Sequence, residues 1–227
     1  MSRGLREEFR KIAERLENEA RKTVEARFFQ EAETFAAQDR LHCLKLAGNA
    51  DLAITKAARH YDLTVLGARA HDDDPETRQV RPDVIALRSG KPVLIVPGRK
   101  PGTSLGRRVV IGWDGKRAAA RTVGELLQLF GPVDEAFVLR IGPPDEAADY
   151  WSEQLCAHFA RHDSVASPVR RDARGSIART ILGFCEEVGA DLLAMGAYEH
   201  SKFSEDVLGG TTNDILKHLN IPVFMAH

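Results

Sequence analysis

The sequence contains the same short pattern twice, and this internal repeat is the feature that most restricts the fold. Residues 62–68 read DLTVLGA and residues 191–197 read DLLAMGA, while residues 91–96 read KPVLIV and residues 221–226 read IPVFMA. Short apolar runs that end at glycine or follow proline are typical of strands buried on both faces of a parallel sheet. The repeat therefore predicts two copies of one α/β module, fused in tandem.

The second copy shows a regular alternation of strands and helices. Such an alternation predicts a parallel, doubly wound sheet with helices on both faces. The expected strands are Arg108 to Trp113, Ala136 to Ile141, Ser167 to Arg171, Leu192 to Met195 and Pro222 to Met225, and the expected helices are about 117–130, 145–162, 176–188 and 212–219.

The first copy is shorter, and its pattern matches only the third, fourth and fifth strands of the second. Strands are expected at Leu41 to Leu46, Leu63 to Gly67 and Pro92 to Pro97, with a helix at about 50–60 between the first two. Apolar residues at steps of three and four from Leu5 to Phe35 predict one long amphipathic helix before them. The opening strand, helix and strand of the module are missing.

Proline and glycine between the copies mark a linker. We therefore predict an incomplete domain over residues 1–98, a linker over 99–106 and a complete domain over 107–227.

The composition is that of an ordinary globular protein. Of its 227 residues 43% are hydrophobic, and the formal net charge is -1, so no general field attracts nucleic acid or an anionic membrane. The sequence shows neither a secretory signal nor a membrane-spanning run, and its three cysteines lack a CxxC spacing. A cytoplasmic protein without a disulfide framework or zinc site is expected.

Glycines at the strand ends of the second copy suggest where a ligand binds. In an open α/β sheet, ligands bind outside the carboxyl ends of the strands. Asp114-Gly115 follows the first strand, Gly196 ends the fourth, and the run from Gly209 to Thr212 precedes the last helix. Backbone N–H groups at paired glycines before a helix can hold a phosphate.

From Arg107 to His227 the chain resembles the universal stress protein family, and the whole chain resembles the tandem form of that family. The family's G-x2-G-x9-G-[S/T] nucleotide loop is read here from Gly196 through Glu199 to Gly209 and Gly210. Members of the ATP-binding kind have a Rossmann-like five-stranded sheet of order 3-2-1-4-5. The resemblance implies that strands one and four of the second copy are neighbours.

The resemblance also implies a set of nucleotide-binding residues. Asp114, with Gly115, would contact the adenosine moiety, and the backbone of Ile141 would contact adenine. ATP is the implied ligand, with Mg²⁺ if it binds. The residues that would surround the phosphates are Gly196, Glu199, Gly209, Gly210, Thr211 and Thr212.

Two positions depart from the family loop, and both act against a triphosphate. Glu199 stands where the loop has its second glycine, and Gly210 stands where it has Ser or Thr. A carboxylate near a phosphate oxygen and a missing hydroxyl together cost roughly 2–5 kcal/mol. Thr211 or Thr212 could supply the hydroxyl instead.

Each motif also has a purely structural interpretation. Gly196 can simply end a strand, and Asp114-Gly115 is a common turn signal. Thr211 with Asp214 three residues later is a helix-capping pattern. The first copy has no glycine between Gly67 and Gly90, so no nucleotide site is predicted there.

Three functions remain open. The first is a stress-response regulatory protein that binds ATP in its second domain. The second is a nucleotide-free dimerisation or scaffold protein, in which the final strands Val93 to Val96 and Val223 to Met225 pair in a homodimer or in an intramolecular pseudo-dimer. The third is a slow ATPase or nucleotidyl-handling enzyme. No catalytic residue and no metal site is predicted, because no triad, Walker lysine or ligand cluster has a recognisable spacing.

Overall fold

The computed structural model describes residues 3–34, 40–68, 80–98, 104–197 and 210–227. It divides into two compact units, Met1–Leu46 and Ala47–His227. The first unit consists of helix α1 (Arg3–Ala32) and the segment that follows it. The apolar side chains of the first half of α1 are exposed, whereas Ala32 near its end is buried. Among the described residues, no helix is both long and apolar enough to cross a membrane.

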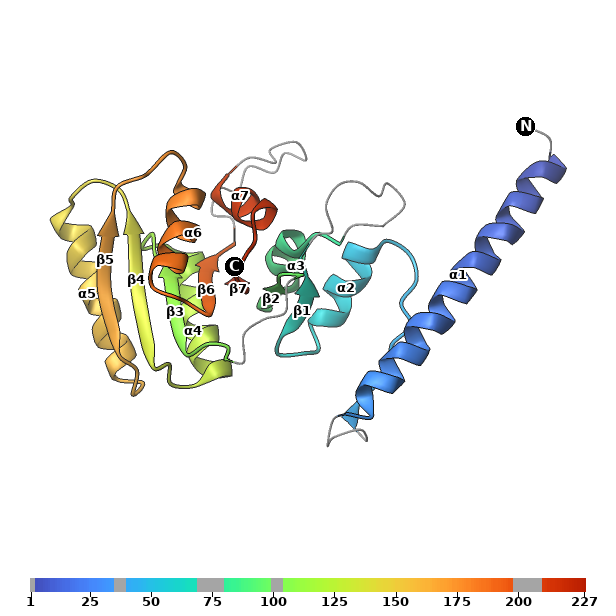
Figure 1. The fold of residues 1–227 in the computed structure, drawn as a ribbon, viewed down its shortest axis with the longest axis horizontal. Helices are drawn as coiled ribbons and strands as arrows, with labels where there is room; N and C mark the ends of the chain where they lie inside the picture. The colour runs from blue at the N-terminus through green and yellow to red at the C-terminus, as the bar shows by residue number, and fades with distance from the viewer. Residues whose placement is uncertain (1–2, 35–39, 69–79, 99–103, 198–209) are drawn as a thin grey trace. The chain divides into compact units, whose positions relative to one another are not determined.

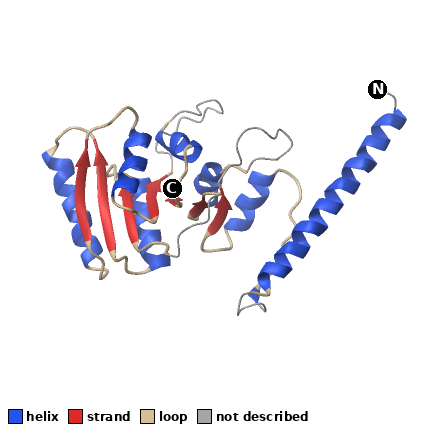
Figure 2. Cartoon of the chain, viewed as in Figure 1, coloured by secondary structure: helices blue, strands red, loops and turns tan. Residues whose placement is uncertain are grey.

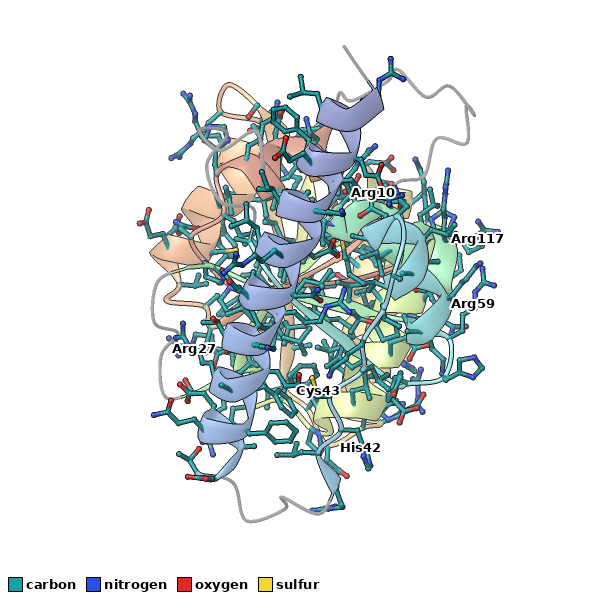
Figure 3. All side chains as sticks on the ribbon, turned by 90° about the vertical axis from the view of Figure 1, so that its right-hand side faces the viewer. Arg10, Arg27, His42, Cys43, Arg59 and Arg117 are labelled. Carbon is teal, nitrogen blue, oxygen red and sulfur yellow. The ribbon has the colours of Figure 1, made fainter. Side chains whose placement is uncertain are left out.

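The predicted strand Leu41 to Leu46 is absent, and that prediction was wrong. His42 and Cys43 of this segment are labelled in Figure 3. In the second copy the corresponding strand, β5 (Ala166–Arg171), pairs along its length with β4 (Glu135–Ile141). The described part of the first copy has no counterpart of β4, and a strand cannot persist without a neighbour to bond to.

The second unit is built on a mixed sheet that runs through both copies (Figure 1). Across it the described strands follow the order β1-β2-β7-β6-β3-β4-β5. Within this order β5-β4-β3-β6-β7 is the 3-2-1-4-5 arrangement expected for the second copy, so the predicted fold class is confirmed. The remaining strands are β1 (Thr64–Gly67), β2 (Val93–Val96), β3 (Arg108–Gly112), β6 (Leu192–Gly196) and β7 (Val223–Ala226).

Helices cover both faces of this sheet (Figure 2). On one face, Leu126 and Phe159 from two helices share a cluster with Val109 of β3. On the other, Ile181 and Ile215 from two further helices share a cluster with Val110. Neighbouring residues of a strand point to opposite faces, so the two clusters are the two halves of a three-layer core. The first face carries α4 (Arg117–Phe130) and α5 (Glu146–Ala160), and the second carries α2 (Ala50–Ala58), α3 (Pro82–Ser89), α6 (Ile177–Glu187) and α7 (Thr211–Lys217).

The two copies are joined by one antiparallel contact, between β2 and β7. The register pairs Val93 with Met225, Leu94 with Phe224 and Ile95 with Val223. Leu94 and Phe224 occupy the same position in their copies, so the junction has the symmetry of a two-fold axis that passes between them. The last strands therefore pair within the chain, in the intramolecular form that the sequence allowed.

This junction lies inside one compact unit, so the sheet crosses the predicted domain boundaries. Those boundaries, at residues 98 and 107, separate the two copies of the module and stay a prediction. All three cysteines, Cys43, Cys156 and Cys185, are free thiols.

β1 forms one margin of the sheet, and no described strand pairs with its outer edge. In the second copy the equivalent strand, β6, has β3 on that side. The consequence is visible in exposure: Val65 of β1 is 58% exposed, whereas its counterpart Ala194 is fully buried. In the described part of the chain, no strand or helix takes beside β1 the place that β3 and α4 take beside β6.

The side chain of Asp191, just before β6, forms hydrogen bonds with the backbone at the start of the second copy. Its Oδ1 accepts hydrogen bonds from the backbone N–H groups of Gly106 and Arg108, at 3.0 and 3.1 Å, and its Oδ2 accepts one from Arg107 at 3.2 Å. Its counterpart in the first copy, Asp62, has a side chain that is 87% exposed and lies 3.9 Å from Lys91 Nζ. The same residue therefore has a structural role in one copy that it lacks in the other.

We expect Asp191→Ala to lower the free energy of unfolding by about 2 kcal/mol or more, because it removes the acceptor of three backbone N–H groups. Asp62→Ala is the matched control and should change the free energy of unfolding by less than about 0.5 kcal/mol. Urea unfolding followed by circular dichroism measures both. Equal losses in the two variants would contradict the assigned role of Asp191.

Candidate functional site

The turn between β3 and α4 places Asp114 at the carboxyl end of the sheet. Oδ1 of Asp114 accepts a hydrogen bond from the backbone N–H of Lys116 at 3.0 Å, and Gly115 has φ +74°. A short acceptor side chain that bonds the backbone two residues later, followed by a left-handed glycine, defines a tight turn. The structural interpretation of Asp114-Gly115 is thus confirmed.

A pocket of about 520 Å³ opens beside this turn, on the face that carries α4 and α5. Ligand-binding pockets usually have volumes of roughly 300–1,000 Å³. Its walls come from the turn, from β4 and from α5, so three separate segments meet at it. The lining residues are Trp113, Asp114 and Gly115 from the turn, Arg140 from β4, and Ala148, Trp151, Gln154, Leu155 and His158 from α5.

The charge of Arg140 is already compensated inside the protein. Its Nη2 and Nε lie 2.5 and 3.2 Å from Oδ1 of Asp149, and its Nη1 donates to the carbonyl oxygen of Pro143 at 2.9 Å. The guanidinium is held in one position, with its side chain only 12% exposed. The Arg140 side chain therefore forms a rigid part of the pocket wall, and its positive charge is largely neutralised by Asp149.

His158, on the α5 side of the pocket, is biased toward its neutral form. Burial lowers its pKa, and the neighbouring His162 and Arg161 lower the pKa further. The rings of His158 and His162 lie edge to face with centroids 4.7 Å apart. In the part of the chain that the structure describes, no cluster of three or more His, Cys, Asp or Glu residues could hold a metal ion.

Gly196 ends β6 where α4 passes close above it. A Cβ atom on Gly196 would lie 2.8 Å from Cβ of Ala118 and from the backbone nitrogen of Ala119, closer than atoms can approach. Thr122 of α4 holds the helix in this position, since its Oγ1 lies 3.2 Å from the carbonyl oxygen of Met195 and accepts from the N–H of Ala226 at 3.1 Å. Glycine at position 196 is thus required by helix packing alone.

The structure brings some of the predicted residues together and separates others. β3 and β6 are neighbours, with Gly112 paired to Met195, so Asp114 and Gly196 both lie at the same edge of the sheet, as expected. Asp114 and Gly115 line the pocket. Ile141 does not, because its side chain packs on the opposite face. Glu199 and Gly209 lie outside the described residues.

The start of α7 differs from its predicted capping pattern. Gly210, with φ +147°, is the N-cap residue, and no side chain caps the helix there. Thr211 is the first residue of the helix, so the expectation that it caps α7 was wrong. Thr212 is buried, with only 6% of its surface exposed. Of the predicted hydroxyl donors, Thr211 is therefore the more accessible.

The chain's C-terminal residue lies near the start of α4. Nδ1 of His227 is 2.7 Å from the carbonyl oxygen of Ala197, and its Nε2 is 3.3 Å from Nη2 of Arg117. The side chain of Arg117 is labelled in Figure 3. The imidazole of His227 thus joins the carboxyl ends of β6 and β7 to the N-terminal end of α4.

Sequence reasoning missed the α5 wall of the pocket. None of its residues was among the predicted site residues. The signal was the spacing of Ala148, Trp151, Leu155 and His158, which recur at steps of three and four and so share one face of a helix. A helix face that packs in the core shows the same spacing, so the pattern alone does not distinguish a pocket wall.

Comparison with known proteins identifies the module. The model of the universal stress protein family matches residues 106–227. A universal stress protein from Archaeoglobus fulgidus is similar in structure, with a TM-score of 0.68 and 19% identity, over 92% of this chain and 79% of that one. A universal stress protein solved in complex with cAMP has 21% identity and a TM-score of 0.41, over 55% of this chain and 98% of that one. No curated protein matches the chain.

Gly196 and Gly67 are equivalent glycines that allow a matched test. Around Gly67 of β1, no atom of the described residues lies within 4 Å of the position of an added Cβ. Gly196→Ala should lower the free energy of unfolding by about 1–3 kcal/mol, because α4 must shift. Gly67→Ala should leave it unchanged or raise it by up to about 1 kcal/mol, since glycine is unfavourable in a strand. Chemical denaturation measures both, and a stable Gly196→Ala variant would refute the close packing of α4.

Proposed function

Because the chain belongs to the universal stress protein family, we propose that it is a stress-response regulatory protein that binds an adenine nucleotide, ATP, through its second copy. The proposed site lies at the carboxyl ends of β3, β4 and β6. Parallel α/β sheets bind ligands at that edge, where the crossover direction changes between neighbouring strands. Here the change occurs between β3 and β6, since β3 continues to β4 on one side and pairs with β6 on the other.

The pocket beside Asp114 is the observation that supports this proposal. It is the right size for a nucleoside, and it combines two indole rings with the Asp114 carboxylate. A carboxylate is a strong acceptor for ribose hydroxyls or for an adenine amino group. The nucleoside half of ATP would therefore occupy the pocket, with Gly115 at its rim and Ile141 reached only through its backbone.

The phosphates would then extend away from Asp114, toward the segment between Gly196 and α7. The residues predicted to surround the phosphates there are Glu199, Gly209, Gly210, Thr211 and Thr212. Mg²⁺ would reduce the repulsion between Glu199 and the phosphate oxygens. The proposal assigns no catalytic step to any residue.

ATP at 100 times its Kd should raise the free energy of unfolding by about 2.7 kcal/mol. A thermal-shift titration with ATP, ADP, AMP, cAMP and GTP, each with and without Mg²⁺, measures this stabilisation. A rise in melting temperature with adenine nucleotides would support the proposal, and no change at millimolar concentrations would contradict it.

Variants of Asp114 separate binding from turn stability. Asp114→Asn keeps an oxygen that can accept from the Lys116 N–H but loses the charge, so we expect unchanged stability and roughly tenfold or more weaker ATP binding. Asp114→Ala should lose both the binding and part of the turn stability. Asp134→Ala is the control, because Asp134 lies just before the start of β4, at the opposite end of the sheet, on an exposed ion pair with Arg107. Equal ATP affinity in Asp114→Asn and Asp134→Ala would remove Asp114 from the site.

A scaffold role without nucleotide is the second candidate function. The observation that favours it is the β2–β7 junction, where strands of the two copies pair and share a buried core. In that case no nucleotide raises the melting temperature, and the titration above distinguishes the two functions.

A further inference from the structure

Two large aromatic side chains of α5 are exposed next to each other. Tyr150 is 52% exposed and Trp151 is 60% exposed, although Leu155 and Phe159 on the same helix are buried against the sheet. Their rings meet edge to face, with centroids 5.1 Å apart. A single exposed apolar residue is common, so exposure alone indicates nothing. What distinguishes Trp151 is that it also lines the pocket, whereas Tyr150 does not.

Two tryptophans are among the residues that line the pocket. Trp113 comes from the end of β3, where its backbone N–H donates to the carbonyl oxygen of Leu139 at 2.9 Å and its ring packs against the core. Trp151 comes from the second turn of α5 and has most of its surface in solvent. These are the only two tryptophans of the chain, and both line this one pocket.

The charges around the pocket favour an uncharged ring as its occupant. Among the described lining residues Arg140 is the one permanent cation, and it is already bonded to Asp149 and to a backbone carbonyl. His158 has a lowered pKa, and Asp114 adds a negative charge. Among the described lining residues, a phosphate would meet no permanent cation other than Arg140, whose charge is already compensated.

We propose that Trp151 stacks on the base of the nucleoside that this pocket is proposed to hold. This inference rests on the proposed nucleotide function and names the residue that gives the site its affinity for the base. Every nucleobase offers a π-face, so stacking on Trp151 strengthens binding of adenosine and guanosine alike. The choice between bases then depends on hydrogen-bonding groups, not on Trp151.

Tryptophan fluorescence of the full-length protein tests the proposal directly, because both fluorophores are at the pocket. In Trp113→Phe the remaining emission comes from Trp151 alone, and adenosine and ATP should both quench it. Ribose 5-phosphate, which has the phosphate but no base, should leave it unchanged. Quenching by ribose 5-phosphate, or by ATP but not by adenosine, would overturn the assignment of the pocket to the nucleoside half.

Affinities from equilibrium dialysis decide the role of Trp151. Trp151→Leu should weaken binding of adenosine and of ATP about ten- to a hundredfold, since a base loses its stacking partner. Tyr150→Leu is the matched control, an exposed aromatic on the same helix outside the pocket, and its affinity should stay within about twofold of the unaltered protein. Circular dichroism verifies that both variants fold.

The outcomes separate this inference from the function on which it rests. If the unaltered protein binds ATP and Trp151→Leu binds it equally well, the stacking role is wrong while the nucleotide function stands. If dialysis detects no nucleotide on the unaltered protein, both are wrong.

Discussion

The antiparallel contact between β2 and β7 is the interaction on which the first copy depends. β1 and β2 alone would be a two-stranded sheet, which is marginal in water. Pairing with β7 makes them the continuation of a larger sheet and places α3 over a core shared with α7. Two residues from each side of the junction are almost fully buried in that core: Val93 and Ile95 from β2, and Val223 and Met225 from β7. The incomplete copy is therefore stabilised by the complete one.

The sequence was most informative where local pattern and burial agree. Short apolar runs that end at glycine or follow proline, such as Leu192 to Met195, predict buried strands, and the repeat supported two of them. The sequence was misleading at Leu41 to Leu46, where the alternation of apolar and polar residues predicted a strand that is absent. Pairing is a property of two segments, and one segment's pattern cannot show that its neighbour is missing. The predicted cap of α7 was also wrong, because the helix begins one residue earlier, with Gly210 and not Thr211 at the N-cap position.

The candidate site was only partly predictable. Asp114 and Gly115 could be found because a turn residue after a buried strand has a fixed place at the sheet edge. The α5 wall could not, because a helix face that lines a pocket and one that packs in the core have the same periodicity. Gly196 shows the converse: the sequence predicts it in a nucleotide loop, yet its close approach to Ala118 is sufficient reason for glycine there. A motif residue and a packing residue can be one and the same.

The symmetry of the junction has a consequence for how the two halves can differ. In a homodimer, a residue on the two-fold axis must meet an identical copy of itself, so any change there happens twice. In this fused chain Leu94 meets Phe224 instead, and Phe224 also packs edge to face on Phe130, with ring centroids 5.6 Å apart. A small and a large side chain share the axis, a combination that no symmetric pair of chains can build. The two sides of this junction can therefore carry different side chains at equivalent positions.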